Sequence, residues 1–82
     1  MTPTQCKMAR AGLGWSAADL GERAGVPREK VARYETGVTI AVASVEAMRL
    51  ALVEAGADFL QLTGKIGVAV PGGTVAIEPD KP

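Results

Sequence analysis

Residues 24–37, AGVPREKVARYETG, combine several charged side chains with very little apolar surface. A proline near the start and a glycine on either side mark this segment as a short, bounded helix. Inside it only Val31 and Tyr34 are large and apolar. The charged side chains on its remaining surface are Arg28, Glu29, Lys30 and Arg33. Basic groups gathered in this way can bind an anionic partner, which raises the question of what the charged side is for.

The same charges also have a purely structural interpretation. Glu29 and Arg33 are four residues apart with the acid first, a pair that stabilises an isolated helix by about 0.2–0.5 kcal/mol. Charge runs on an arbitrary helix are usually solvated surface. The spacing of the neighbouring helices is therefore needed to choose between a binding surface and a solvated surface.

Other reactive groups are scarce. The chain contains no histidine, and Cys6 is its only cysteine. Without histidine, Cys6, Ser16 and Ser44 have no ordinary general base, and no cluster has the spacing of metal ligands. The PGGT stretch lacks the lysine of a phosphate-binding loop. We therefore expect neither an enzyme nor a metal or cofactor site.

Composition and charge narrow the class of protein. A chain of 82 residues is a single domain, and its formal net charge is zero. Residues 1–37 hold six basic and four acidic side chains, so any nucleic-acid face belongs there. The lone cysteine and the lack of a signal-peptide core or membrane-length apolar segment predict a cytoplasmic protein without membrane contact. Neither a pocket nor a small-molecule ligand is implied by so small a core.

Start and stop signals divide the first part of the chain into four helices. The first is expected from about Pro3 to Gly12, with Thr2 as its cap. The second begins at Ser16, whose hydroxyl forms a capping box with Asp19, and Gly25 ends it. The third runs from about Pro27 to Thr36. A fourth fits residues 42–56, VASVEAMRLALVEAG.

After Gly56 the pattern changes to two-residue alternation, which predicts two or three short strands in a meander or hairpin. Ile66, Val68 and Val70 share one face of this region, and Val75 and Ile77 follow after a PGG break. The expected fold is therefore mainly α, with four to five helices and a short C-terminal β-meander or hairpin.

Residues 17–34 have the layout of a helix-turn-helix unit, because only Gly25 and Val26 separate its two helices. The run RAGLGWSAADLGERAGVPREKVARYETG resembles the helix-turn-helix regulators of the Xre type, the class of the lambdoid phage repressor and Cro proteins. The resemblance covers roughly residues 4–60. We divide the chain into a helix-turn-helix core, residues 1–57, a strand extension, residues 58–78, and a loose tail, residues 79–82. The positions that the unit needs for its structure are Ser16, Leu20, Gly21, Gly25, Val31, Tyr34 and Glu35.

The resemblance implies that the third helix lies in the major groove of double-stranded DNA. The base-reading positions it implies are Arg28, Glu29, Ala32 and Arg33. Either arginine can pair with O6 and N7 of a guanine, and Glu29 can accept from a cytosine amino group. Lys30 lies on the flank, where a phosphate contact is favoured.

Three further positions follow from the same resemblance. An arginine in the first helix of the family often pairs with the glutamate that closes the third, so Arg10 and Glu35 are expected to be structural, with a secondary phosphate contact for Arg10. Ala17 occupies the position where a family glutamine touches a phosphate, and Pro27 replaces the usual serine or threonine. These two substitutions predict fewer phosphate contacts and greater dependence on dimerisation.

The function implied is that of a sequence-specific transcriptional regulator, a dimeric repressor that reads a two-fold operator. Ile66, Val68 and Val70 are candidates for the dimer contact, and covering the helical core is the equally favoured alternative for them. The rival function is an antitoxin or another protein-interaction module on the same scaffold. Ala17, Pro27 and the neutral charge favour this rival, whereas a charged third helix without an apolar anchor argues against it.

Overall fold

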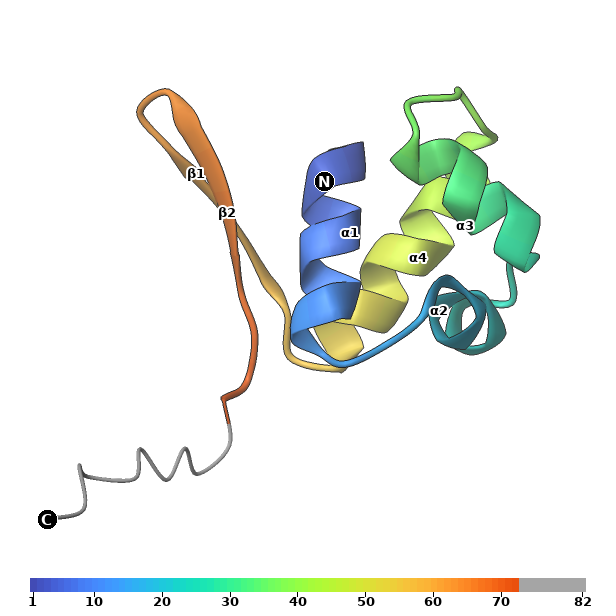
Figure 1. Cartoon of the computed structure of the whole chain (residues 1–82), viewed down its shortest axis with the longest axis horizontal. Helices are drawn as coiled ribbons and strands as arrows, with labels where there is room; N and C mark the ends of the chain where they lie inside the picture. The colour runs from blue at the N-terminus through green and yellow to red at the C-terminus, as the bar shows by residue number, and fades with distance from the viewer. Residues whose placement is uncertain (73–82) are drawn as a thin grey trace, which may run out of the picture.

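The computed structural model describes residues 1–72. Its elements in chain order are α1 (Pro3–Gly12), α2 (Ala17–Ala24), α3 (Arg28–Glu35), α4 (Val42–Glu54), β1 (Asp58–Leu62) and β2 (Lys65–Ala69). The four helices form one group, and the hairpin of β1 and β2 stands beside α1 on the side opposite to α3 (Figure 1). The mainly helical fold with a small hairpin is as expected from the sequence. No helix within residues 1–72 has the length and apolar character needed to cross a membrane.

The expected helices are present, with small shifts at their ends. The third is shorter by one residue at each end, because Pro27 and Thr36 are its caps rather than its first and last residues. The fourth ends at Glu54, and Ala55 is its cap. Of the two or three expected strands, two form within the described residues. Val75 and Ile77, the proposed continuation of the meander, lie outside them, as does the expected tail.

The turn between α2 and α3 depends on two glycines. Gly25 ends α2 with a φ of 70°, a left-handed conformation that suits glycine. One turn earlier, Gly21 lies directly beneath the chain that leads into α3. A Cβ added to Gly21 would stand 2.4 Å from the carbonyl oxygen of Val26. The missing side chain is therefore what allows α3 to approach α2 so closely.

Small and aliphatic side chains make up the core between the helices. Leu20, Val31, Met48 and Leu52 are fully buried there, one or two from each of α2, α3 and α4. Cys6 and Ala9 contribute the inner side of α1. Trp15, the only tryptophan, packs against this cluster but is only half-buried. Because large side chains are scarce in this core, the four helices can pack close together.

The hairpin is joined to the helices by the side chain of Gln5. Its amide nitrogen donates to the carbonyl oxygens of Leu60 (3.0 Å) and Gly67 (3.2 Å), which face each other across the two strands. Its oxygen accepts from the backbone N–H of Thr2, completing a capping box with the Thr2 hydroxyl. The buried side chain of Gln5 thus caps α1 and holds both strands at once.

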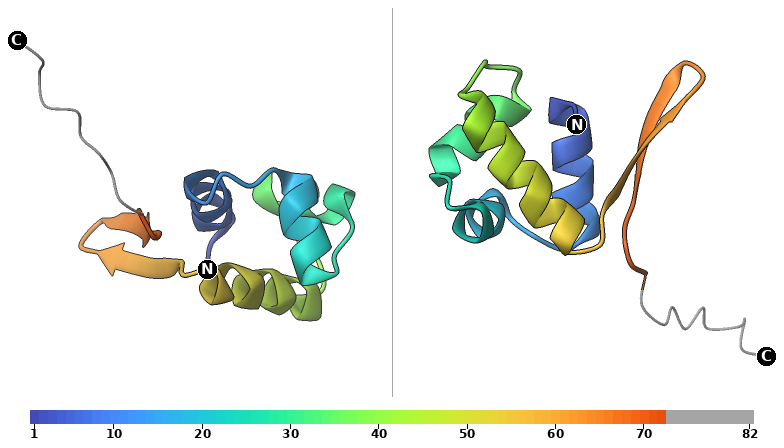
Figure 2. Two further views of the ribbon diagram at one scale, coloured as in Figure 1. Left: turned by 90° about the horizontal axis from the view of Figure 1, so that it is seen from below. Right: turned by 180° about the vertical axis from the view of Figure 1, so that it is seen from behind.

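One face of the hairpin turns toward α1, and the other turns away (Figure 2). Phe59, Val68 and Val70 pack against the core, and Val70 fills the space beside Gly12. Two of the three expected dimer candidates, Val68 and Val70, thus contribute to covering the helices. Ile66 lies nearer the hairpin turn and is 39% exposed.

We predict that Gly21→Ala destabilises the protein, although alanine is the better helix former by about 1 kcal/mol. The added methyl group meets backbone, which cannot move away cheaply, so the net loss in the free energy of unfolding should be about 1–3 kcal/mol. Urea unfolding followed by circular dichroism measures it, with Glu22→Ala on the exposed side of α2 as the control. A Gly21→Ala variant more stable than the parent would contradict the close approach.

We predict that Gln5→Glu releases the hairpin from α1. A carboxylate can still accept from Thr2, but it cannot donate to the two strand carbonyls, at a cost of about 1–3 kcal/mol. Hydrogen exchange of the amides in residues 58–69 should accelerate, while amides in α3 keep their protection. Gln61→Glu, an exposed change of the same chemistry within the hairpin, serves as the control and should leave exchange unchanged.

Candidate nucleic-acid interface

The outward side of α3 carries every charged residue that the sequence singled out on this helix. Val31 and Tyr34 are buried, whereas the other five residues of the segment 28–33 are all exposed. These five are Arg28, Glu29, Lys30, Ala32 and Arg33. They form what we call the α3 face, with three basic side chains and one acidic one.

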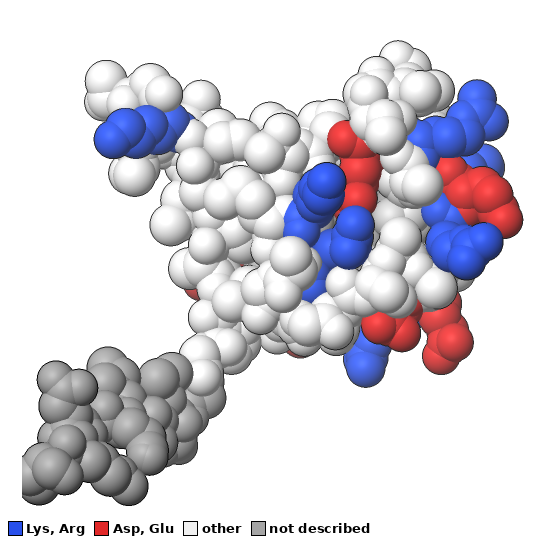
Figure 3. Space-filling view, viewed as in Figure 1, with Lys and Arg blue, Asp and Glu red and all other residues white. Residues whose placement is uncertain are grey.

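The alternative role for this charge run was an ion pair within the helix. The structure contains two ion pairs among residues 1–72, Arg10–Glu35 and Arg49–Glu46, and Glu29–Arg33 is not one of them. Charged side chains, mostly basic, gather over α3 on the side away from the hairpin (Figure 3). The side chains of the α3 face are thus available to an outside partner.

Behind this face, α3 is held by its two buried residues and one further hydrogen bond. The hydroxyl of Tyr34 donates to the carbonyl oxygen of Met1 at 3.0 Å. Burial raises the pKa of this phenol above its usual value. The contact joins the inner side of α3 to the segment that precedes α1.

The last residue of α3 forms a bidentate ion pair with α1. Arg10 donates from Nε to Glu35 Oε2 at 2.7 Å and from Nη2 to Oε1 at 2.8 Å, and its Nη1 donates to the Trp15 carbonyl oxygen at 3.2 Å. The Glu35 side chain is 6% exposed and that of Arg10 is 18% exposed. Their hydrogen bond to each other raises the pKa of Arg10, so the guanidinium stays charged. It fixes α3 against both α1 and the loop that leads into α2.

Cys6 belongs to the same buried group. Its thiol lies 3.5 Å from Glu35 Oε2, to which it donates a weak hydrogen bond. Burial first, and then the charge of Glu35 and the hydrogen bond to it, raise the pKa of Cys6 to about 12. A thiol that stays protonated is a poor nucleophile, which agrees with a packing role.

The expected phosphate positions differ in what they offer. Lys30 is exposed beside the α3 face, and Ala17 is the half-buried first residue of α2. Arg10, in contrast, uses three of its nitrogens within the protein, as its structural role requires. Asp19 adds a negative charge at the start of α2. Its carboxylate accepts from the backbone N–H of Ser16, and hydrogen bonding with Ser16 lowers the pKa of Asp19.

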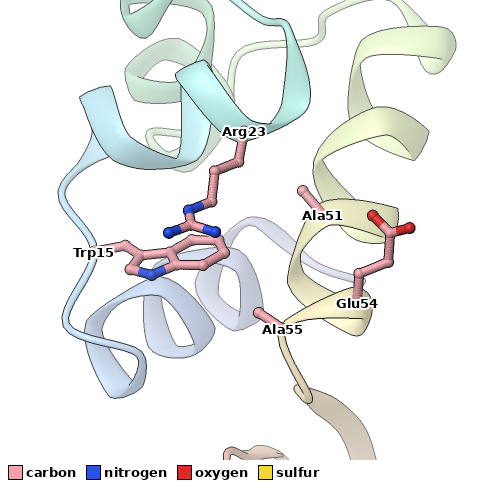
Figure 4. Close-up of a pocket in the computed structure, with 5 residues that line it drawn as sticks. All are labelled: Trp15, Arg23, Ala51, Glu54 and Ala55. Atoms are coloured by element: carbon pink, nitrogen blue, oxygen red, sulfur yellow. The ribbon is translucent and has the colours of Figure 1, made fainter.

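A surface hollow of about 260 Å³ lies between α2 and α4 (Figure 4). The guanidinium of Arg23 lies over the Trp15 ring, 4.5 Å from its centroid, and Glu54 stands across the hollow on α4. The hollow lies at the surface and not in the core. Arg23 is thereby directed to Trp15 and not to the α3 face.

Two of these contacts were not predicted from the sequence. Gln5 had a recognisable signal, since threonine followed three residues later by glutamine is the pattern of a capping box. Its second role, in holding the hairpin, has no local signal. The stacking of Arg23 on Trp15 likewise depends on where the loop before α2 places the indole.

We predict that Glu35→Ala lowers the free energy of unfolding by about 3 kcal/mol, because it leaves Arg10 partly buried and unpaired. Thermal and urea unfolding measure the loss. Glu46→Ala is the matched control, since it breaks the exposed pair with Arg49 and should leave stability nearly unchanged. Equal effects of the two substitutions would show that burial does not distinguish the pairs.

The arrangement of α2 and α3, joined by a tight glycine turn and backed by α1 and α4, agrees with the family comparison. A family model described as a helix-turn-helix domain matches residues 5–65, a region that begins within α1 and includes α2, α3, α4, β1 and the hairpin turn. A search of curated proteins finds no match to the chain. Since the matched region makes up most of the chain, this protein belongs to the helix-turn-helix domain family.

Proposed function

We propose that the protein is a sequence-specific DNA-binding transcriptional regulator of the Xre type, and that it acts as a dimeric repressor on a two-fold operator. The observation that carries the proposal is the α3 face. It is exposed and predominantly basic, and its side chains form no ion pair within residues 1–72. It lies on the second helix of a helix-turn-helix unit, where such proteins contact base edges.

The chemistry of the α3 face suits the major groove. Arg28 stands at the start of α3, and Arg33 lies beyond its first turn. Each guanidinium has two parallel donors for O6 and N7 of guanine, and Glu29 can accept from the amino group of cytosine. The Ala32 methyl group between them suits an apolar contact with a thymine methyl. A well-formed pair of this kind discriminates against a wrong base by roughly 1–3 kcal/mol.

Contacts with the phosphates support the proposal less strongly. Lys30 can reach a phosphate, and the start of α3 has no side-chain cap, so its first backbone N–H groups are open to one. At the start of α2, however, Asp19 brings a negative charge, and Ala17 has no polar group to offer. One subunit should therefore bind DNA weakly, and a second subunit on a second half-site would supply the missing affinity.

The test is selection of bound sites from a random pool of double-stranded DNA, with the parent protein and with Arg28→Ala and Arg33→Ala. We predict a two-fold motif whose guanine preference relaxes at one position per half-site in each variant. Affinity for the selected site should fall by about 1–3 kcal/mol, or roughly five- to 150-fold. Failure to select any motif at low salt would disprove the proposed function.

Two control variants separate base reading from general electrostatics. Arg49→Ala removes an exposed arginine of α4 that is paired with Glu46, and it should leave both motif and affinity unchanged. Lys30→Ala should weaken binding to all sequences alike and reduce the slope of log affinity against log salt by about one. Arg28→Ala behaving like Lys30→Ala would assign Arg28 to a phosphate.

A further inference from the structure

No part of residues 1–72 covers the side of the hairpin that turns away from α1, and this side carries exposed leucines. Paired residues of an antiparallel hairpin share a face, so the register assigns six residues to this side. We call them the outer face: Asp58, Leu60, Leu62, Lys65, Gly67 and Ala69. Leu60 is 44% exposed and Leu62 is 61% exposed. A two-stranded hairpin with such a face lacks the second layer that sheets normally have.

We propose that the outer face is the surface on which a second copy of this chain packs, face to face about a two-fold axis that crosses the strands near Leu60. The proposal rests on the dimer of the proposed function and says which surface forms it. It replaces the expected contact through Val68 and Val70, since these side chains are directed toward the helices.

Charge is the first argument for a second copy as the occupant. Asp58 lies at the base of the outer face and Lys65 at its tip, beside the hairpin turn. Neither is in an ion pair within residues 1–72. When two hairpins pack about an axis across their strands, the base of one lies over the tip of the other. Asp58 of each copy then approaches Lys65 of the other, so the face is complementary to itself.

Shape is the second argument. Leu60 is paired with Gly67, and the next residue of β2 on this face is Ala69. The β1 side of the outer face therefore projects two leucines, while the β2 side is low. About an axis across the strands, β1 of one copy lies over β1 of the other, so Leu60 of the two copies would meet near the axis, with Leu62 of each copy flanking the pair. Two sheets that pack face to face bury their apolar side chains in this manner.

Another exposed apolar surface, on α4, is less suited to this role. Leu50 (48% exposed) and Val53 (40% exposed) lie on α4, but the neighbouring charges, Glu46 and Arg49, already pair with each other. The hairpin also lies on the opposite side of α1 from α3, so packing through it leaves the α3 face free for DNA in both copies (Figure 1).

Sedimentation velocity of the full chain without DNA tests the proposal. The parent should show a monomer–dimer equilibrium, and Leu60→Gln should raise the dissociation constant of the dimer about tenfold or more. Leu50→Gln, a matched change of an equally exposed leucine, should leave it unchanged. Circular dichroism and the exchange of hairpin amides establish that each variant remains folded.

Charge reversal tests the arrangement itself. Asp58→Lys and Lys65→Asp should each weaken the dimer, because each places like charges opposite one another at both ends of the interface. The double variant should restore it, since the two ion pairs re-form with reversed sign. Restoration would not follow if the charges affected only the solubility or stability of one chain.

Several results would overturn the proposal. A dimer that survives Leu60→Gln but not Leu50→Gln would assign the interface to α4. A parent protein that stays monomeric at its highest soluble concentration would exclude a second copy and leave the outer face to a different protein. These outcomes are separable from failure of DNA binding, because a monomeric Leu60→Gln variant should still bind a single half-site with the sequence preference of the parent.

Discussion

The buried ion pair between Arg10 and Glu35 is the interaction on which the orientation of α3 depends. With one carboxylate and one guanidinium it joins α1, the end of α3 and, through the Trp15 carbonyl, the loop before α2. Both hydrogen bonds of the pair are short, and a bidentate geometry restricts rotation as well as distance. The helix has only Val31 and Tyr34 as buried apolar side chains, so polar contacts have to supply the rest of its attachment. The α3 face therefore forms no ion pair within residues 1–72 and is exposed to an outside partner.

Gln5 has a comparable role on the opposite side of α1. Its buried amide uses its oxygen for the cap of α1 and its nitrogen for both strands of the hairpin. A buried amide that makes all of these bonds pays little for its desolvation, while the loss of any one of them is costly. Together with the packing of Phe59, Val68 and Val70 against the core, this side chain determines where the hairpin stands. α1 is therefore the common support of two elements, one on each side.

The two supported elements differ in chemistry and suit different partners. The α3 face is polar, basic and unpaired, whereas the outer face of the hairpin is aliphatic with one charge at each end. A net charge of zero conceals this division, because it averages a basic helix with acidic residues placed elsewhere. The neutral total thus argues for weak general attraction to DNA, and not against a local DNA-binding surface.

The sequence by itself determined the four helices, the Thr2 and Ser16 caps and the turn at Gly25, because these depend on residues within a few positions of each other. It also indicated which side of α3 is charged, since the period of a helix places Val31 and Tyr34 on one face and Arg28 and Arg33 on another. Only the tertiary structure decided which face of the hairpin turns inward. Alternation separates the two faces, but both carry aliphatic residues, and the choice depends on α1, through Gln5 and the space beside Gly12. The stacking of Arg23 on Trp15 was decided in the same way, by contacts that no local pattern encodes.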